Sequence, residues 1–469
     1  MKPAFWHKQH KWWGLVAAFF LAMLGVSGIA LNHRGPLRHA ELSRAWLPPH
    51  YAFERWNGGL FRGTLESDSA VLIYGSNGVW QADSLGHAVR PINDGLPTGD
   101  GRNVRRIVRA ADGNLYAAAL YGLYHLDGNR WHSVELPLAE DERLTDIETV
   151  GDSVVVLSRD RAFVVVAGEE VSSLEMSRPE GYEGKVTLFR IVWMLHSGEL
   201  FGMGGRIAAD LLGLVFLLLC VTGVTFFALR GRGRRWSLVW HSRTGQWTIV
   251  LTLLMAVTGW CLRPPVMIPL ALTKTAPPSG TALDSDNPFH DKLRMLRYDA
   301  DRGDWLLSTS DGFFSLDSLR AVPRQLESTP PVSVMGLNVW ERDGSGRWLC
   351  GSFSGMYVWD RSAGSSTDWF TGEVAPLEAG PPFGKRAVAG YSADFGRPFV
   401  VEYDAGTDAI PQPEWMRHLP MSAWNVALEI HSGRIYMGNI ATYIFIFLAG
   451  IAAVWTLWTG YRLLPRRRK

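Results

Sequence analysis

Cysteine is scarce in this chain of 469 residues, which contains only Cys220, Cys261 and Cys350. Three scattered cysteines provide neither a disulfide framework nor the paired spacing of zinc and redox sites. Glycine-rich nucleotide-binding patterns are also missing, because the glycines within 202–205 do not follow a predicted strand. No motif therefore indicates a disulfide scaffold, a zinc protein, or a nicotinamide- or flavin-binding domain.

An excess of charge of one sign is missing as well. Lysine and arginine together number 47 and aspartate and glutamate 45, which gives a net charge of +2 at pH 7. The basic residues gather beside apolar runs, and this argues against nucleic acid as a partner.

Long apolar runs are what the sequence does have. Its mean hydropathy is zero because very apolar stretches alternate with ordinary polar segments. A helix needs about 20 apolar residues to cross a bilayer core, and four stretches reach or approach that length. They are 12–31, 207–229, 247–262 and 440–461. The sequence thus predicts an α+β membrane protein with four transmembrane helices and large polar segments between them.

Basic residues beside the apolar runs predict the orientation. They precede the first run, fill the link between the second and third, and follow the fourth. The positive-inside rule places all three groups in the cytoplasm and the long segments, roughly 33–195 and 263–430, outside. The residues concerned are Lys2, Lys8, Lys11, Arg230, Arg232, Arg234, Arg235, Arg462, Arg466, Arg467, Arg468 and Lys469.

The N-terminal run has a competing interpretation as a cleaved signal peptide, since a basic start leads into it. It is longer than a typical signal core, and its removal would leave an odd number of spans. We therefore expect both termini in the cytoplasm. The expected segments are transmembrane helices at 1–34, 190–230, 247–263 and 426–462, periplasmic β-rich halves at 35–189 and 264–425, a cytoplasmic link at 231–246 and a basic tail at 463–469.

The chain repeats itself in tandem. His10 and Gly28 recur as His241 and Gly259 at a constant offset of 231 residues, so the first and third apolar runs are equivalent. Leu-His-Ser-Gly at 195–198 recurs as Ile-His-Ser-Gly at 430–433, just before the second and fourth runs. A four-helix bundle formed by duplication follows from this pattern.

A shorter repeat runs through the polar segments. Glycine followed by an apolar residue and an aromatic one occurs at Gly78, Gly122, Gly312 and Gly355, with spacings of 44 and 43 residues within each half. This spacing is typical of β-propeller blades, and the strands resemble propeller repeats of two-component sensors. Weaker copies around 162–163 and 396–399 would make three blades per half. One split six-bladed propeller or two separate β-rich domains would satisfy the pattern.

Histidines mark both ends of the predicted spans. Duplication about an axis along the membrane normal places His10 opposite His241 on the cytoplasmic side. It likewise places His196 opposite His431 on the outer side. Two opposed imidazoles on facing helices can hold a haem iron from both sides. We therefore expect these four histidines to be the axial ligands of two haems, which would be of the b type because Cys-x-x-Cys-His is absent.

Two alternatives to this assignment stay open. Histidines at a membrane interface can cap helix ends or pack beside tryptophan without any cofactor. His33 lies on the outer side and could replace His196 or His431 as a ligand. His7, one turn before His10, is a similar substitute on the inner side.

Further polar residues accompany the spans. Arg206 and Asp210 stand four apart near the outer end of the second span, where they would pair on one helix face. Alternatively, Arg206 would hold a haem propionate. Every span also carries a serine or threonine followed by glycine, which we interpret as a step for close helix packing. These hydroxyl residues are Ser27, Thr222, Thr258 and Thr459.

The spans resemble those of a known family. A histidine opening an apolar run that ends in Ser/Thr-Gly, as at His10 to Gly28 and His241 to Gly259, is similar to the PepSY-associated transmembrane-helix proteins, as is Asn32-His33 after the first run. The resemblance covers the helices, about a third of the chain. No PepSY domain is recognisable in the outer segments.

The resemblance implies a function, because that family includes bacterial inner-membrane reductases of ferric siderophores. It supports His10, His241, His196 and His431 as haem ligands and His33 as a further candidate. Electrons would pass from a cytoplasmic or quinol donor to a periplasmic ferric chelate or protein acceptor. The alternative is a haem-free sensor or assembly protein whose periplasmic propeller binds a ligand or protein.

Overall fold

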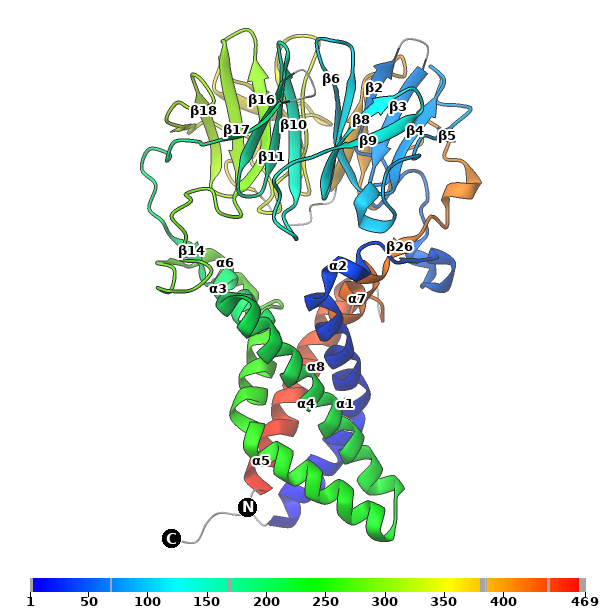
Figure 1. Ribbon diagram of the computed structural model, residues 1–469, viewed down its shortest axis with the longest axis vertical. Helices are drawn as coiled ribbons and strands as arrows, with labels where there is room; N and C mark the ends of the chain where they lie inside the picture. Colours follow the sequence, from blue (N-terminus) through cyan, green and yellow to red (C-terminus); the bar gives the residue numbers. More distant parts are fainter. Residues whose placement is uncertain are drawn as a thin grey trace. The chain divides into compact units, whose positions relative to one another are not determined.

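The computed structural model describes residues 3–67, 70–166, 170–379, 384, 386–436 and 439–463. Each of its two compact units is assembled from both halves of the chain (Figure 1). Lys2 and the basic tail at 464–469, which contributed to the expected orientation, lie outside the described residues. The helical unit comprises Met1–Leu37, Glu183–Asp286 and Ala423–Lys469, and the β unit comprises Arg38–Tyr182 and Asn287–Ser422.

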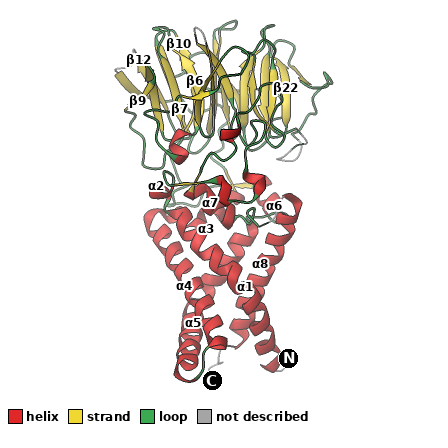
Figure 2. Ribbon diagram, turned by 90° about the vertical axis from the view of Figure 1, so that its right-hand side faces the viewer, coloured by secondary structure: helices red, strands yellow, loops and turns green. Residues whose placement is uncertain are grey.

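Four long helices make up most of the helical unit (Figure 2). Helices α1 and α5 each pack against both α4 and α8, so the four helices form a closed bundle. All four are long and apolar enough to cross a membrane. Their outward side chains, such as Val16 and Val250, are apolar and exposed, which suits contact with lipid. The protein is thus a multi-pass membrane protein. The helices are α1 (Pro3–Asn32), α4 (Gly202–Ala228), α5 (Gly231–Cys261) and α8 (Asn439–Leu463).

Two short helices precede α4 and α8, so the expected segments 190–230 and 426–462 are each broken. Helix α3 (Leu188–Ser197) begins where Thr187 Oγ1 accepts a hydrogen bond from the N–H of Arg190 at 3.2 Å. It ends at Gly198, whose φ of 82° is left-handed and easiest for glycine. Helix α7 (Ala423–His431) is likewise followed by Gly433, with φ of 77°. The repeated His-Ser-Gly motif therefore ends a short helix and turns the chain toward the next span.

Helix α5 corrects another expected boundary. It begins at Gly231, so the stretch 231–246, expected as a link, is helical and carries His241 on a continuous helix. Arginine and tryptophan are compatible with helix and also suit the polar edge of a bilayer, so the end of the apolar run did not mark the end of the helix. The turn between α4 and α5 shrinks to residues 229–230.

Smaller elements complete the helical unit. They are α2 (Arg34–Leu37), α6 (Met267–Leu272), and the paired strands β14 (Val186–Thr187) and β15 (Lys274–Thr275).

Six antiparallel sheets form most of the β unit, which makes the chain an α+β protein. The first half contributes β2 (Gly63–Ser67), β3 (Ala70–Gly75), β4 (Gly78–Ala82) and β5 (Arg90–Pro91); β6 (Val104–Arg109), β7 (Leu115–Ala119), β8 (Gly122–Asp127) and β9 (Arg130–Val134); and β10 (Leu144–Val150), β11 (Ser153–Ser158), β12 (Ala162–Val166) and β13 (Glu170–Leu174). The second half contributes β16 (Leu293–Asp299), β17 (Asp304–Thr309), β18 (Gly312–Leu316) and β19 (Arg324–Gln325); β20 (Leu337–Arg342), β21 (Trp348–Ser352), β22 (Gly355–Asp360) and β23 (Ser365–Asp368); and β24 (Val388–Ser392) and β25 (Phe399–Glu402). Strands β1 (Glu41–Leu42) and β26 (Met421–Ser422) pair separately.

The glycine repeat marks the same place in four sheets. Gly78, Gly122, Gly312 and Gly355 each begin the third strand, directly after a two-residue hairpin turn. The weaker copy at 162–163 begins β12, the third strand of the third sheet. The copy expected at 396–399 differs, because it leads into β25, the second strand of a two-stranded sheet.

Buried apolar clusters join each sheet to the next along the chain. Leu72 and Ile107 lie in one cluster between the first and second sheets, and comparable clusters follow as far as the sixth sheet. The sixth sheet also packs against the first, since Val401 shares a cluster with Ile73 and Trp80. The six sheets therefore succeed one another in a cycle, three from each half of the chain.

Candidate functional site

Two histidine pairs lie inside the helical unit. His10 on α1 and His241 on α5 face each other with ring centroids 5.9 Å apart and planes at 60°. They lie near the end of the bundle where α4 turns into α5, which we call the hairpin end. His196 at the end of α3 and His431 at the end of α7 face each other with centroids 6.1 Å apart and planes at 45°. They lie near the opposite end, which we call the short-helix end.

Each of the four imidazoles is held by the Ser/Thr-Gly step of a neighbouring span. His10 Nδ1 lies 3.2 Å from Thr459 Oγ1, and His241 Nδ1 lies 3.2 Å from Thr222 Oγ1. At the other end, His196 Nδ1 lies 3.1 Å from Thr258 Oγ1. The fourth contact, between His431 Nδ1 and Ser27 Oγ, is also 3.1 Å long. The steps that we interpreted as packing devices thus also contact the histidines, and we call them cradles.

The hydrogen bonds of the cradles fix which ring nitrogen carries the proton. Each cradle hydroxyl donates to a carbonyl one turn back on its own helix, as Thr258 does to Leu254 at 2.8 Å, so it accepts from the histidine. His10 and His241 also donate from Nδ1 to the carbonyls of Thr456 and Leu219, each at 3.0 Å. All four rings therefore carry a proton on Nδ1. Within the described residues no hydrogen bond reaches their Nε2 atoms, so in the neutral imidazole each Nε2 has a lone pair available to a metal.

Glycine in each cradle leaves room for the ring. A Cβ added at Gly28, Gly223 or Gly460 would lie 3.1–3.2 Å from Cε1 of the imidazole in that cradle. At Gly259 the separation from His196 Cε1 would be only 2.7 Å. A larger residue at these positions would push against the imidazole, so the glycines set its position.

Two expected candidates lie apart from the pairs. His33 is largely exposed, and its Nε2 lies 3.1 Å from Asp210 Oδ2. Arg206 lies 3.6 Å from Glu199 Oε1, and Asp210 accepts a further bond from Asn32 Nδ2 at 2.8 Å. The structure therefore places His33 in a polar cluster with Asn32 and Asp210 rather than beside another histidine.

Arg263 is a candidate that the sequence analysis missed. It follows α5 directly and lies close enough to His196 and His431 for its charge to act on both rings. Its guanidinium is half-buried and forms no hydrogen bond or ion pair with any residue that the structure describes. The available signal was a basic residue at the end of a span where the positive-inside rule predicts few of them.

The spacing of the pairs suits a shared metal. A metal–imidazole bond is about 2 Å long and a ring nitrogen lies about 1 Å from the ring centre, so two rings on one metal have centres roughly 6 Å apart. Both observed separations agree with this value. No cluster of three or more His, Cys, Asp or Glu that could hold a metal occurs in the described part of the chain. A metal bound here would need most of its ligands from another molecule.

Comparison with solved structures gives only distant likenesses. An extracellular domain of a proposed one-component system from B. thetaiotaomicron matches at 10% identity over 76% of this chain and 38% of that one, with a TM-score of 0.34. An ancestral GH74 enzyme matches at 9% identity over 70% of this chain and 31% of that one, with a TM-score of 0.31. The chain thus spans about a third of the length of these two proteins, and TM-scores this low carry no argument. No curated protein matches the sequence.

Comparison with protein families is decisive. The model of the PepSY-associated TM region matches twice in tandem, over residues 2–230 and 224–467. The two matches cover nearly the whole chain and coincide with the two halves of the duplication. The chain therefore belongs to the family of proteins with a PepSY-associated transmembrane region.

Proposed function

We propose that the helical unit holds two b-type haems and conducts electrons across the membrane. His10 and His241 would ligate one iron at the hairpin end, and His196 and His431 the other at the short-helix end. When bound, each haem supplies a one-electron carrier whose potential depends on ligands, burial and hydrogen bonding. The observation that carries the proposal is the paired geometry, in which the two imidazole rings of each pair stand at the centroid separation of two ligands on one metal.

The cradles support haem over the interfacial alternative. A histidine that only caps a helix end needs no fixed tautomer, whereas a metal ligand needs its other nitrogen held by an acceptor. All four rings have that acceptor. Since two histidines cannot complete a zinc site, a porphyrin that brings its own four nitrogens fits better. Arg263 has the charge and position to bind a propionate at the short-helix end, and Arg206 remains a second candidate.

The basic residues at the hairpin end support an orientation of the protein in the membrane, and the membrane potential then favours one direction of electron flow. Arg230, Arg232, Arg234 and Arg235 gather there, so the positive-inside rule places this end in the cytoplasm. Both termini would be cytoplasmic and the β unit periplasmic, in a bacterial inner membrane. A membrane potential that is negative inside favours outward movement of each electron by about 2.3 kcal/mol per 100 mV.

We infer that the electrons enter from a cytoplasmic or quinol donor and reduce a periplasmic acceptor. Membership of the PepSY-associated family favours a ferric siderophore or another ferric chelate as that acceptor, which would make the protein a transmembrane ferric-chelate reductase. We also infer that the six sheets are the blades of one propeller, three from each half. The cyclic order of the buried clusters supports this over two separate domains.

The absorption spectrum of the purified full chain tests the proposal. We expect a Soret band, sharp α and β bands on reduction, and two haems per chain. Replacing His10, His241, His196 or His431 by Ala should lower the ratio to one, because each substitution removes one ligand of one iron.

His33→Ala is the matched control. It changes a histidine at the same membrane face, but His33 contacts Asp210 instead of another histidine, so both haems should remain. A colourless, folded preparation would reject the haem proposal in favour of the sensor or assembly alternative. Full haem content in all four single variants would reject the assignment of ligands.

A further inference from the structure

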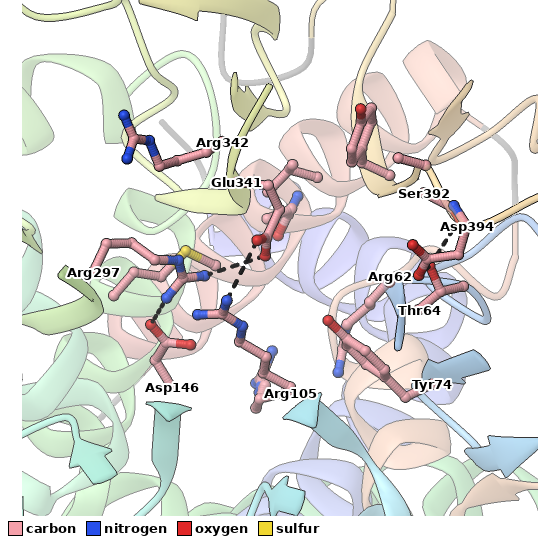
Figure 3. A pocket seen from close by; sticks show the side chains of 17 residues that line it. Arg62, Thr64, Tyr74, Arg105, Asp146, Arg297, Glu341, Arg342, Ser392 and Asp394 are labelled. Carbon is pink, nitrogen blue, oxygen red and sulfur yellow. Dashed lines mark hydrogen bonds and ion pairs between the residues drawn. The ribbon is translucent and has the colours of Figure 1, made fainter. Parts of the chain in front are cut away.

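The β unit contains a cavity that has no part in the proposed electron path. Its volume is about 210 Å³, far more than the roughly 10–15 Å³ that one water needs. The first strand of every one of the six sheets lines it, so it lies at the centre of their cycle (Figure 3). One residue from each of these strands is Thr64 (β2), Arg106 (β6), Asp146 (β10), Arg297 (β16), Glu341 (β20) and Ser392 (β24).

Part of the charge in this cavity is internally balanced. Arg297 contacts Asp146 at 2.5 Å, and both side chains are almost completely buried. Arg106 lies 2.8 Å from Glu148 and 3.3 Å from Glu341. Arg297–Asp146 and Arg106–Glu341 join sheets from different halves of the chain, Arg106–Glu148 joins two sheets of the first half, and the charges compensate each other.

Two further arginines in the cavity have no carboxylate partner among the residues that the structure describes. Arg62 donates to Asn103 Oδ1 at 2.6 Å and to the carbonyl of Val104 at 2.7 Å, both neutral acceptors. Arg105 forms no hydrogen bond or ion pair with any described residue, and its Nε is buried. Burial lowers the pKa of Arg62 to about 10 and, together with the charge of Arg62, the pKa of Arg105 to about 9. Both remain positive at pH 7, and a buried charge without a counter-ion is costly.

We propose that this cavity binds a small oxyanion, with a carboxylate or phosphate group held by Arg62 and Arg105. The planar guanidinium forms paired hydrogen bonds to the oxygens of such groups. Thr64, Ser392 and Asn338 add neutral polar groups to the lining. Asp394 and Glu341 lie in the same cavity and favour an anion that also carries hydroxyl donors, as citrate does. The β unit would then have a ligand of its own, independent of the histidine pairs.

Calorimetric titration of the full chain in detergent tests this site, with citrate and inorganic phosphate as separate probes. We expect saturable binding of one anion per chain by at least one probe, and comparison of the two identifies the preferred group. Arg105→Gln should weaken binding by about ten- to a hundredfold, the effect of losing a hydrogen bond to a charged group. Because Arg105 has no partner to lose, this variant should fold, and its unfolding temperature confirms that.

Arg324→Gln is the control, since Arg324 is an exposed arginine of the same unit that pairs with Asp317. It should bind the anion as the unaltered protein does. The proposal is overturned if neither probe binds saturably at millimolar concentration, or if Arg105→Gln binds as tightly as Arg324→Gln. His10→Ala should bind normally, so failure here and failure of the haem proposal are distinguishable.

Discussion

The two halves of the chain follow one plan, but they are not equally alike throughout. In the helical unit the paired histidines of the first half, His10 and His196, have counterparts in His241 and His431 of the second, with the same hydroxyl contact to Nδ1. In the β unit the third sheet has four strands, whereas its counterpart, the sixth, has two in the described residues. A site that takes one ligand from each half, as we propose for each haem, needs both copies intact. A sheet needs only an apolar face for its neighbour, so it tolerates divergence.

Removing the buried ion pair between Arg297 and Asp146, which connects the two halves of the β unit, should have the largest effect on stability. Arg297→Met leaves Asp146 of the other half as a buried charge without its partner. Loss of one member of a buried pair typically costs about 3–5 kcal/mol, so the β unit should unfold at a clearly lower temperature.

Thermal unfolding followed by circular dichroism measures this change. Arg324→Met is the control, because its exposed pair with Asp317 contributes little. The haem absorption should survive in both variants. An unfolding temperature equal to that of the control would show that Arg297 does not join the halves.

The two His-Ser-Gly turns should respond unequally to alanine. Both Gly198 and Gly433 have left-handed backbones, which cost an alanine about 1–2 kcal/mol. A Cβ at Gly198 would also lie 2.1 Å from the carbonyl oxygen of Gly205, whereas at Gly433 it would meet the end of the Ile446 side chain at 2.2 Å. The end of a side chain can move aside more easily than the backbone, so Gly198→Ala should be the more damaging change. We expect Gly198→Ala to lower the free energy of unfolding by about 2–4 kcal/mol in total, from backbone strain and the clash together.

Thermal stability and haem content of the two alanine variants decide this point. Gly204→Ala is the control, since a Cβ there meets nothing within 4 Å. If both variants lost the same stability, backbone strain in the turn, rather than the contact with Gly205, would account for the effect of alanine at position 198.

The equivalent glycines of two cradles provide a finer comparison. At Gly259 an added Cβ would lie 2.7 Å from His196, and at Gly28 it would lie 3.2 Å from His431. We expect Gly259→Ala to displace the imidazole of His196. The affinity for haem at the short-helix end should then fall by about tenfold, the usual effect of disturbing the support of a metal ligand. Gly28→Ala should retain most of the haem.

Haem stoichiometry under dilution measures both variants, with the pair of His10 and His241 as an internal reference. If Gly28→Ala lost haem as readily as Gly259→Ala, the position of the imidazole would not depend on the distance between the added Cβ and the ring.

The sequence was sufficient to predict the features that repeat. Four apolar runs indicated the four helices, and the offsets of 231 and 235 residues indicated the duplication and which histidines would face one another. Glycine spacing located the third strand of most sheets, because each repeat glycine is the first residue of that strand, directly after a two-residue turn.

Other features depend on contacts between distant segments. The Ser/Thr-Gly steps were visible, but which histidine each one holds depends on how the helices are rotated and paired. Arg263 and Arg105 could not be recognised as lacking a partner, since that requires knowledge of all neighbouring side chains. The helical start of α5 was missed because apolarity marks the membrane core rather than the end of the helix.

The smallest expected effect tests whether the two halves hold the two proposed ligands of one iron alike. Thr258→Val and Ser27→Ala each remove the hydroxyl that accepts from Nδ1, on His196 and His431 respectively. Weaker support makes the imidazole a poorer donor, which favours the reduced iron, so each change should raise the midpoint potential of the same haem. A shift of up to about 60 mV, tenfold for one electron, is the scale expected. Thr252→Val is the matched control, because that buried hydroxyl bonds only within α5. Redox titration should show shifts of the same sign in both variants and none in the control; opposite signs would mean that the two ligands of one haem are held in different ways.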